Sequence, residues 1–154
     1  MGAGSDLTRR HMLAECFLVD VLGLAWSQVH HDADRVAAIM SSHVEARLWE
    51  LLEMPGTCPH GNPIPGSPNA PDQRAAIRLA DATGPVTVTR VAEQVEHDHE
   101  AMVLLERGGM TPGRLAEVRG RVDGGVDVVG ATCDAIVPEH VAQHVYVTPY
   151  QLGG

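Results

Sequence analysis

Residues 10–24 read RHMLAECFLVDVLGL, and an amphipathic pattern runs through this stretch. The apolar residues Leu13, Phe17 and Val21 recur four residues apart, and Cys16 and Val19 lie alongside them. Side chains three or four residues apart share one face of a helix. The pattern therefore predicts an amphipathic helix over Leu7–Gly23, which ends at the glycine.

Two further helical patterns follow. Val29, Val36 and Met40 lie on or near one face of a helix over residues 27–40. A third helix over residues 42–52 would bury a stripe made of Val44, Leu48 and one or both of Leu51 and Leu52. Ser42 with Glu45 three residues later predicts a capping box at its start, because the two side chains would satisfy free backbone N–H groups.

The amino-acid composition changes over residues 54–84, which hold six prolines: Pro55, Pro59, Pro63, Pro65, Pro68 and Pro71. Proline has no backbone N–H and restricts the residue before it, so this segment is predicted to be a linker. After Gly84 the pattern favours strands near Val86–Val91, Leu115–Arg119, Val126–Val129 and Val145–Val147. Asp123-Gly124-Gly125 predicts a hairpin turn, and short helices are expected over His99–Glu106 and Pro138–Gln143.

The expected fold class is therefore α+β with two domains. A helical domain over 5–53 is followed by the linker over 54–84 and by a small β-barrel over 85–150.

The charge of the chain argues against binding nucleic acid. Its 154 residues carry a formal net charge of −9, with no lysine and only scattered arginines. Phosphate neutralisation needs clustered basic residues. Three widely spaced cysteines imply no disulfide framework, and no signal peptide or membrane-spanning run is seen, so a reducing cytoplasm is the expected location.

Two groups of residues have the chemistry of metal ligands. His11 and Glu15 are four apart on the first predicted helix, and His30 near the start of the second could face them. Imidazole and carboxylate together suit divalent iron, manganese or zinc. The alternative is a solvated surface pair. Residues 93–100 crowd Glu93, Glu96 and His99 among further acidic and imidazole groups, for which an exposed polar loop is the alternative.

The remaining histidines give weaker evidence for a metal site. His140 and His144, and His60 near Cys58, are expected to be ordinary surface residues. The chain has no nucleophile elbow, no phosphate-binding loop and no His-Glu-x-x-His, so no enzyme is predicted.

Five segments of the chain resemble one family. Residues 10–24 resemble the "RHRLAERLLVDVLGL" helix of iron-dependent repressors of the diphtheria-toxin-repressor type, and residues 29–33 resemble its "VHxEA". Residues 40–45 resemble "MSxxVExRL", and residues 59–66, PHGNPIPG, are similar to the distinctive "SPxGNPIPG" linker. Residues 104–113 look like part of the SH3-like (FeoA-like) domain. The resemblance covers nearly all of Leu7–Tyr150.

The resemblance implies a metal-binding and dimerisation domain followed by an SH3-like domain. It places His11, Glu15 and His30 in the family's ancillary metal site, completed by Glu93 and Glu96, or by Glu96 and His99 if the alignment slides. The family's primary regulatory site is degenerate. Its Cys or Glu falls at Asp34, and its Glu-His pair falls at Ala37 and Ala38, which offer no donor atoms.

The resemblance also implies what the chain does and with whom. The expected function is a metal-binding, homodimeric regulator of transcription that lacks the winged helix-turn-helix and binds no DNA alone. Mixed dimers with a full-length repressor are a further expectation, and no membrane partner is expected. The alternatives are a metal buffer or carrier, and an interaction module that keeps only the fold. The missing domain could reflect a natural loss or an artefact of the start site.

Overall fold

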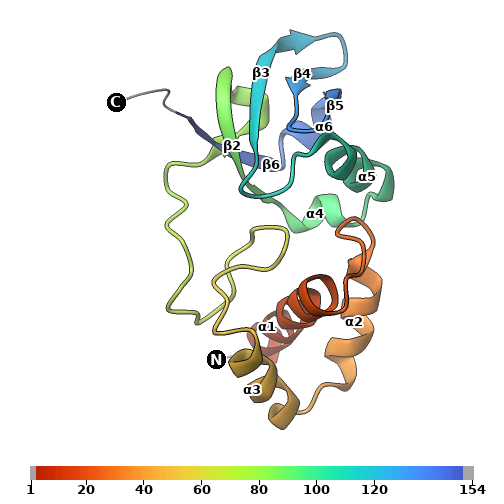
Figure 1. The fold of residues 1–154 in the computed structure, drawn as a ribbon, viewed down its shortest axis with the longest axis vertical. Coiled ribbons are helices and arrows are strands. Elements are labelled where there is room, and N and C mark those ends of the chain that lie inside the picture. The colour runs from red at the N-terminus through yellow and green to blue at the C-terminus, as the bar shows by residue number, and fades with distance from the viewer. Residues whose placement is uncertain (1–2, 151–154) are drawn as a thin grey trace. The chain divides into compact units, whose positions relative to one another are not determined.

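The computed structural model describes residues 3–150. The chain divides into two compact units, Met1–Pro71 and Asp72–Gly154, so the division falls inside the predicted linker. Helices make up the first unit and a sheet with short helices makes up the second (Figure 1). This confirms the expected α+β organisation.

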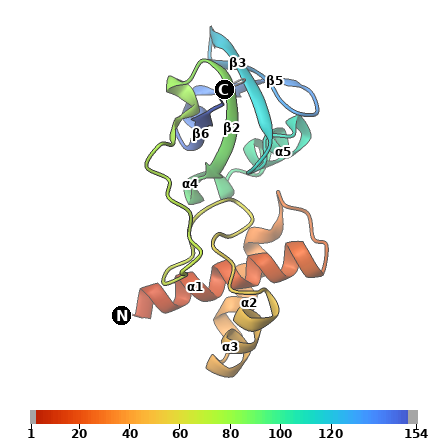
Figure 2. The same ribbon diagram turned by 60° about the vertical axis from the view of Figure 1, so that its left-hand side comes forward.

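The first helix begins at Ala3, before the predicted start at Leu7. Helix α1 (Ala3–Cys16) continues into a turn of π-helix, η1 (Phe17–Val21), and Gly23 beyond it has a φ of +75°. Helices α2 (Val29–Ile39) and α3 (Ser42–Leu51) both pack against α1 (Figure 2). The residues buried between these helices form one cluster: Ala14, Leu18, Val29, Ala33 and Met40.

The predicted capping box at Ser42 is wrong. Ser41 caps α3, since its Oγ accepts a hydrogen bond from the backbone N–H of Val44 at 3.2 Å. Glu45 is turned to α1 instead, with Oε1 2.6 Å from Nε of Arg10 and Oε2 3.5 Å from Nε of Arg9. The Glu45 carboxylate that the capping box would use therefore forms ion pairs with α1 instead.

Part of the proline-rich segment folds onto the helices. Thr57 and Pro63 form an antiparallel bridge, and the N–H of Cys58 donates to the carbonyl of Asn62 at 2.9 Å. The tip of this turn is closed by a hydrogen bond of 2.9 Å from Gly61 N–H to Cys58 O. Ile64 packs into a second buried cluster with Leu13 and Cys16, so the turn belongs to the core of the first unit.

The second unit is an antiparallel sheet of order β1-β6-β2-β3-β4-β5. Its strands are β1 (Ile77–Arg78), β2 (Gly84–Val91), β3 (Leu115–Val122), β4 (Gly125–Val129), β5 (Asp134–Pro138) and β6 (Val145–Pro149). A 3₁₀ turn, η2 (Leu79–Asp81), and helices α4 (Glu93–Glu96), α5 (His99–Gly108) and α6 (Glu139–Ala142) complete the unit. The predicted hairpin turn is confirmed by the pairing of Val122 with Gly125.

Among residues 3–150, no helix combines the length and apolar character that crossing a membrane requires.

Candidate metal centre

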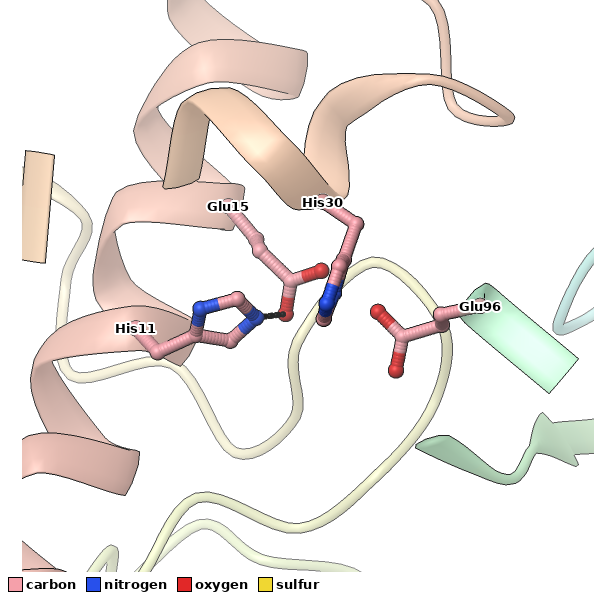
Figure 3. A group of neighbouring side chains, drawn as sticks. All are labelled: His11, Glu15, His30 and Glu96. Carbon is pink, nitrogen blue, oxygen red and sulfur yellow. Dashed lines mark ion pairs between the residues drawn. The ribbon is translucent and has the colours of Figure 1, made fainter. Parts of the chain in front are cut away.

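Three predicted ligands lie together inside the first unit. His11 and Glu15 project from one face of α1, and His30 projects toward them from α2 (Figure 3). The three residues offer ligand atoms that all lie within 4.8 Å of one another. Nε2 of His11 is 3.4 Å from Oε1 of Glu15, and the rings of His11 and His30 are 4.9 Å apart in an edge-on arrangement.

Helix packing explains this convergence. Leu13 and Ala14 are fully buried, and Ala14 packs against Val29 and Ala33 of α2. The face of α1 that carries His11 and Glu15 is therefore held against the start of α2, where His30 is buried. The i, i+4 spacing sets the first pair, and the contact between the helices supplies the third residue.

Asp34 also belongs to this group of side chains. It lies one turn after His30 on α2, and its Oδ1 is 2.8 Å from Nδ1 of His11. Its Oδ2 is 3.5 Å from Nε2 of His30. The neighbouring Ala37 is buried in the core, and Ala38 is exposed. Neither alanine side chain has a donor atom that could bind a metal.

A second donor group consists of Glu15, Cys58 and His60, whose ligand atoms also lie within 4.8 Å of one another. The expectation that His60 is a surface residue is wrong, since its exposed fraction is 0%, and the neighbouring Cys58 is 3% exposed. Nδ1 of His60 is 3.1 Å from Oε2 of Glu15. Nε2 lies 3.0 Å from the backbone carbonyl of Trp26, which can only accept, so Nε2 is the donor there.

The tight turn at residues 57–63 is what presents these two side chains. Pro59 separates Cys58 from His60, and its carbonyl accepts a hydrogen bond of 2.8 Å from the Trp26 indole N–H. The turn is thus fastened to the segment between η1 and α2. A Cys-x-His triplet inside a segment that resembles an ordered linker is the signal in the sequence that could have identified this group.

Glu15 is shared by both donor groups. Its exposed fraction is 1%, with one oxygen toward His11 and the other toward His60. A buried carboxylate costs several kcal/mol unless positive charge or hydrogen bonds compensate it. A divalent cation held by these imidazole, thiolate and carboxylate donors would provide that compensation, and the donor set suits zinc, iron or manganese.

The thiol of the nearby Cys16 does not readily lose its proton. Burial, before any other cause, raises the pKa of the Cys16 thiol far above its usual range. Charge at Cys58, Asp20 and Glu15 raises this pKa further, whereas His60 lowers it. Cys16 is therefore a neutral thiol, and its Sγ lies 3.5 Å from the carbonyl oxygen of Thr57.

The remaining predicted ligands lie in the second unit. Glu93 and Glu96 are the first and last residues of α4, and His99 is the first residue of α5. Glu93 and His99 are exposed, and Asp98 caps α5 by accepting from the N–H of Ala101 at 3.1 Å. That Glu93 and Glu96, or Glu96 and His99, complete the centre stays a prediction. His140 is exposed, as expected, and His144 is half-buried.

Comparison with known proteins identifies the first unit. Residues 3–66 match the model of the iron-dependent repressor metal-binding and dimerisation domain. The diphtheria toxin repressor of Corynebacterium jeikeium is 31% identical over 161 residues, covering 90% of this chain and 67% of that protein. The chain belongs to the iron-dependent repressor family. The repressor IdeR of Mycobacterium tuberculosis is 36% identical over 148 residues, and the match spans 88% of this chain and 64% of that relative's length.

Solved structures agree with this assignment. A manganese-dependent transcriptional repressor superposes with a TM-score of 0.80 at 28% identity, covering 96% of this chain and 82% of that one. ScaR with bound Zn²⁺ gives a TM-score of 0.76 at 28% identity, covering 96% of this chain and 73% of that one. Both units therefore have counterparts in metal-dependent repressors.

The burial of Cys58 leads to a thiol-labelling prediction. In native, chelator-treated protein at pH 8, we expect a disulfide reagent to label one of the three thiols quickly, because Cys133 is exposed while Cys16 and Cys58 are buried. Denaturant should release the other two. The Cys133→Ser variant serves as the control and should show no fast labelling. Fast reaction of either remaining thiol in that variant would contradict their burial.

Proposed function

We propose that this chain is the metal-sensing and dimerising part of a metal-dependent transcriptional regulator in a reducing cytoplasm, and not an enzyme. The observation that carries the proposal is the Glu15 carboxylate, which is buried between imidazoles from three segments of the first unit. His11, Glu15 and His30 are the proposed metal ligands within this unit. The family assignment supports a divalent transition metal as the ion.

Glu93 and Glu96 are the proposed ligands from the second unit, and the support for them is the sequence resemblance. Three carboxylates brought to one place repel one another, and a divalent cation offsets that repulsion. Metal binding would then order the two units together. His99 replaces Glu93 in the alternative alignment. The chain's own part in sensing is to make this assembly depend on the ion.

Cys58 and His60 widen the choice of ion. Thiolate is a soft ligand that suits zinc and iron, whereas imidazole with carboxylate also suits manganese. The hydrogen bond from His60 Nε2 to Trp26 O leaves Nδ1 directed at Glu15, which is the arrangement of a metal-binding histidine with a fixed tautomer. We propose that the thiol-containing group holds soft ions and shares Glu15 with His11 and His30.

Dimerisation is proposed to use the apolar surface of α2 and α3. Leu48, Trp49 and Leu52 pack against the core of their own chain and are therefore less available to a partner. Ile39 at the end of α2 is 86% exposed, and Val44 and Leu51 of α3 are about half exposed. Val44, Leu48 and Leu51 line a groove of about 600 Å³ along α3, which a second copy would cover.

The metal proposal predicts one ion per chain that stabilises the fold. At a metal concentration about a hundredfold above the dissociation constant, linkage adds about 2.7 kcal/mol to the free energy of unfolding. We therefore expect manganese or zinc to raise the melting temperature relative to chelator. Glu15→Gln should abolish the increase, because a neutral amide cannot neutralise the ion. The exposed Glu50→Gln is the matched control and should retain it.

Cobalt distinguishes the two donor groups in the same preparation. A thiolate-to-cobalt charge-transfer band that is lost in Cys58→Ser would place the ion on the thiol group. A cobalt complex without this band would place it on His11 and His30. No bound metal by elemental analysis and no change in melting temperature would end the proposal.

The dimer proposal predicts that charge on α3 dissociates the protein. Val44→Asp with Leu51→Asp should give monomers in light scattering at micromolar concentration, because a buried aspartate at an apolar interface has no partner. Ala46→Asp, which adds charge to the same helix at another exposed position, should leave the dimer intact. A wild-type chain of monomer mass under these conditions would contradict the proposal.

The charge of the chain leads to a prediction about DNA. Operator binding by the 154-residue chain should be absent in gel-shift assays at moderate salt, since a net charge of −9 opposes the approach to phosphate. Metal-loaded and chelated samples should behave alike. A metal-dependent shift with this chain alone would show that it contains a DNA-binding surface, and the regulatory proposal would need revision.

A further inference from the structure

Trp26 holds the turn at residues 57–63 at two points. It lies in the segment between η1 and α2, and its indole N–H donates to the carbonyl of Pro59 at 2.8 Å. Its own backbone carbonyl lies 3.0 Å from Nε2 of His60. The centroids of the Trp26 and His60 rings are 4.8 Å apart, with an angle of 58° between the ring planes. One residue therefore contacts the tip of the turn through its ring, its indole N–H and its main chain.

The indole hydrogen bond sets the main backbone torsion that the sequence leaves free between the α-carbons of Cys58 and His60. The proline ring fixes φ of Pro59, and the planar peptide bond excludes rotation about the bond to His60. Proline also restricts Cys58 before it to extended conformations. The torsion that remains is ψ of Pro59, which rotates its carbonyl. Because the indole N–H holds that carbonyl, it fixes the direction in which the chain passes from Cys58 to His60.

The rest of the turn brings the two donors together with Glu15. Gly61 follows His60 with a φ of +86°, a left-handed conformation that reverses the chain, and its N–H donates to the carbonyl of Cys58 at 2.9 Å. The ligand atoms of Glu15, Cys58 and His60 then all lie within 4.8 Å of one another. This convergence depends on the separation of the thiol from the imidazole, and therefore on the torsion that Trp26 holds.

We infer that Trp26 is a positioning residue for the group formed by Glu15, Cys58 and His60, and that its indole N–H fixes the separation of the thiol and imidazole donors. The inference rests on the proposed function of this group as the site for soft ions. Groups that orient metal ligands without touching the metal typically account for about a 10- to 100-fold difference in affinity. Trp26 thereby acts on the choice of ion, because only one of the two donor groups contains the turn.

The existence of two donor groups separates this role from a purely structural one. His11 and His30 come from α1 and α2 and do not belong to the turn. A change at Trp26 that only loosened the first unit would weaken metal binding at both groups alike. Loss of the indole N–H by itself should weaken the thiol-containing group selectively. Trp26→Phe makes that change, since phenylalanine keeps an aromatic ring beside His60 and the backbone carbonyl that His60 contacts.

The test measures zinc and manganese affinity in the same variants. Trp26→Phe should lower zinc affinity about tenfold or more, and should change manganese affinity less than about threefold. Trp49→Phe is the matched control, because Trp49 is the other tryptophan of the chain, is also half-buried in the first unit and loses the same atoms. It should change neither affinity more than about threefold. Retained manganese binding also shows that Trp26→Phe is folded.

Thiol labelling supplies a measurement that needs no metal. In the chelated Cys133→Ser protein, Trp26→Phe should speed the labelling of Cys58 about two- to tenfold, which is the effect of losing one hydrogen bond on a local opening equilibrium. Trp49→Phe should leave the Cys58 rate close to that of its parent. Mass spectrometry of the labelled peptides separates Cys58 from Cys16.

The outcomes distinguish the inference from the proposed function. Equal losses of zinc and manganese affinity in Trp26→Phe, unchanged zinc affinity, or unchanged labelling of Cys58 would overturn the role of Trp26. A wild type that binds neither ion would refute the proposed function and this inference together. Zinc binding by the wild type without a selective loss in Trp26→Phe would refute the inference alone.

Discussion

The buried carboxylate of Glu15 is the constraint on which the first unit depends. The side chain is almost fully removed from water, and a carboxylate in such a place needs compensation from its surroundings when it is charged. α2 brings His30 close by, α1 itself provides His11, and the turn at residues 57–63 brings His60. These contacts account for the packing of a proline-rich segment against helices, which the apolar contact of Ile64 then reinforces.

Local periodicity predicts most of the elements, because their causes are local. The four-residue apolar spacing identifies α1, and the alternation around a Gly-Gly turn identifies β3 and β4. β1 and β5 escaped prediction for a physical reason. β1 has two residues, and β5 buries only Val137 fully, so neither shows a period that separates a strand from a loop.

The metal centre was only partly predictable. The spacing of His11 and Glu15 is a property of one helix, so it can be recognised in the sequence. His60 and Cys58 were missed because their burial depends on contacts far away in the chain, such as that between Trp26 and Pro59. Proline argues for a loop but cannot show where the loop folds. The contact of Asp34 with His11 was missed for the same reason, since it joins two helices.

Charge balance connects the two donor groups to the rest of the chain under the proposed function. A divalent ion held by Glu15 with the neutral imidazoles of His11 and His30 keeps a net positive charge, which is costly in a buried site. A Cys58 thiolate would cancel that charge using the first unit alone. Without the thiolate, neutrality requires one further carboxylate, and Glu93 or Glu96 is the proposed source. The ligand that a metal prefers would therefore decide whether its binding engages the second unit, and a single shared glutamate would link metal identity to the state of the protein.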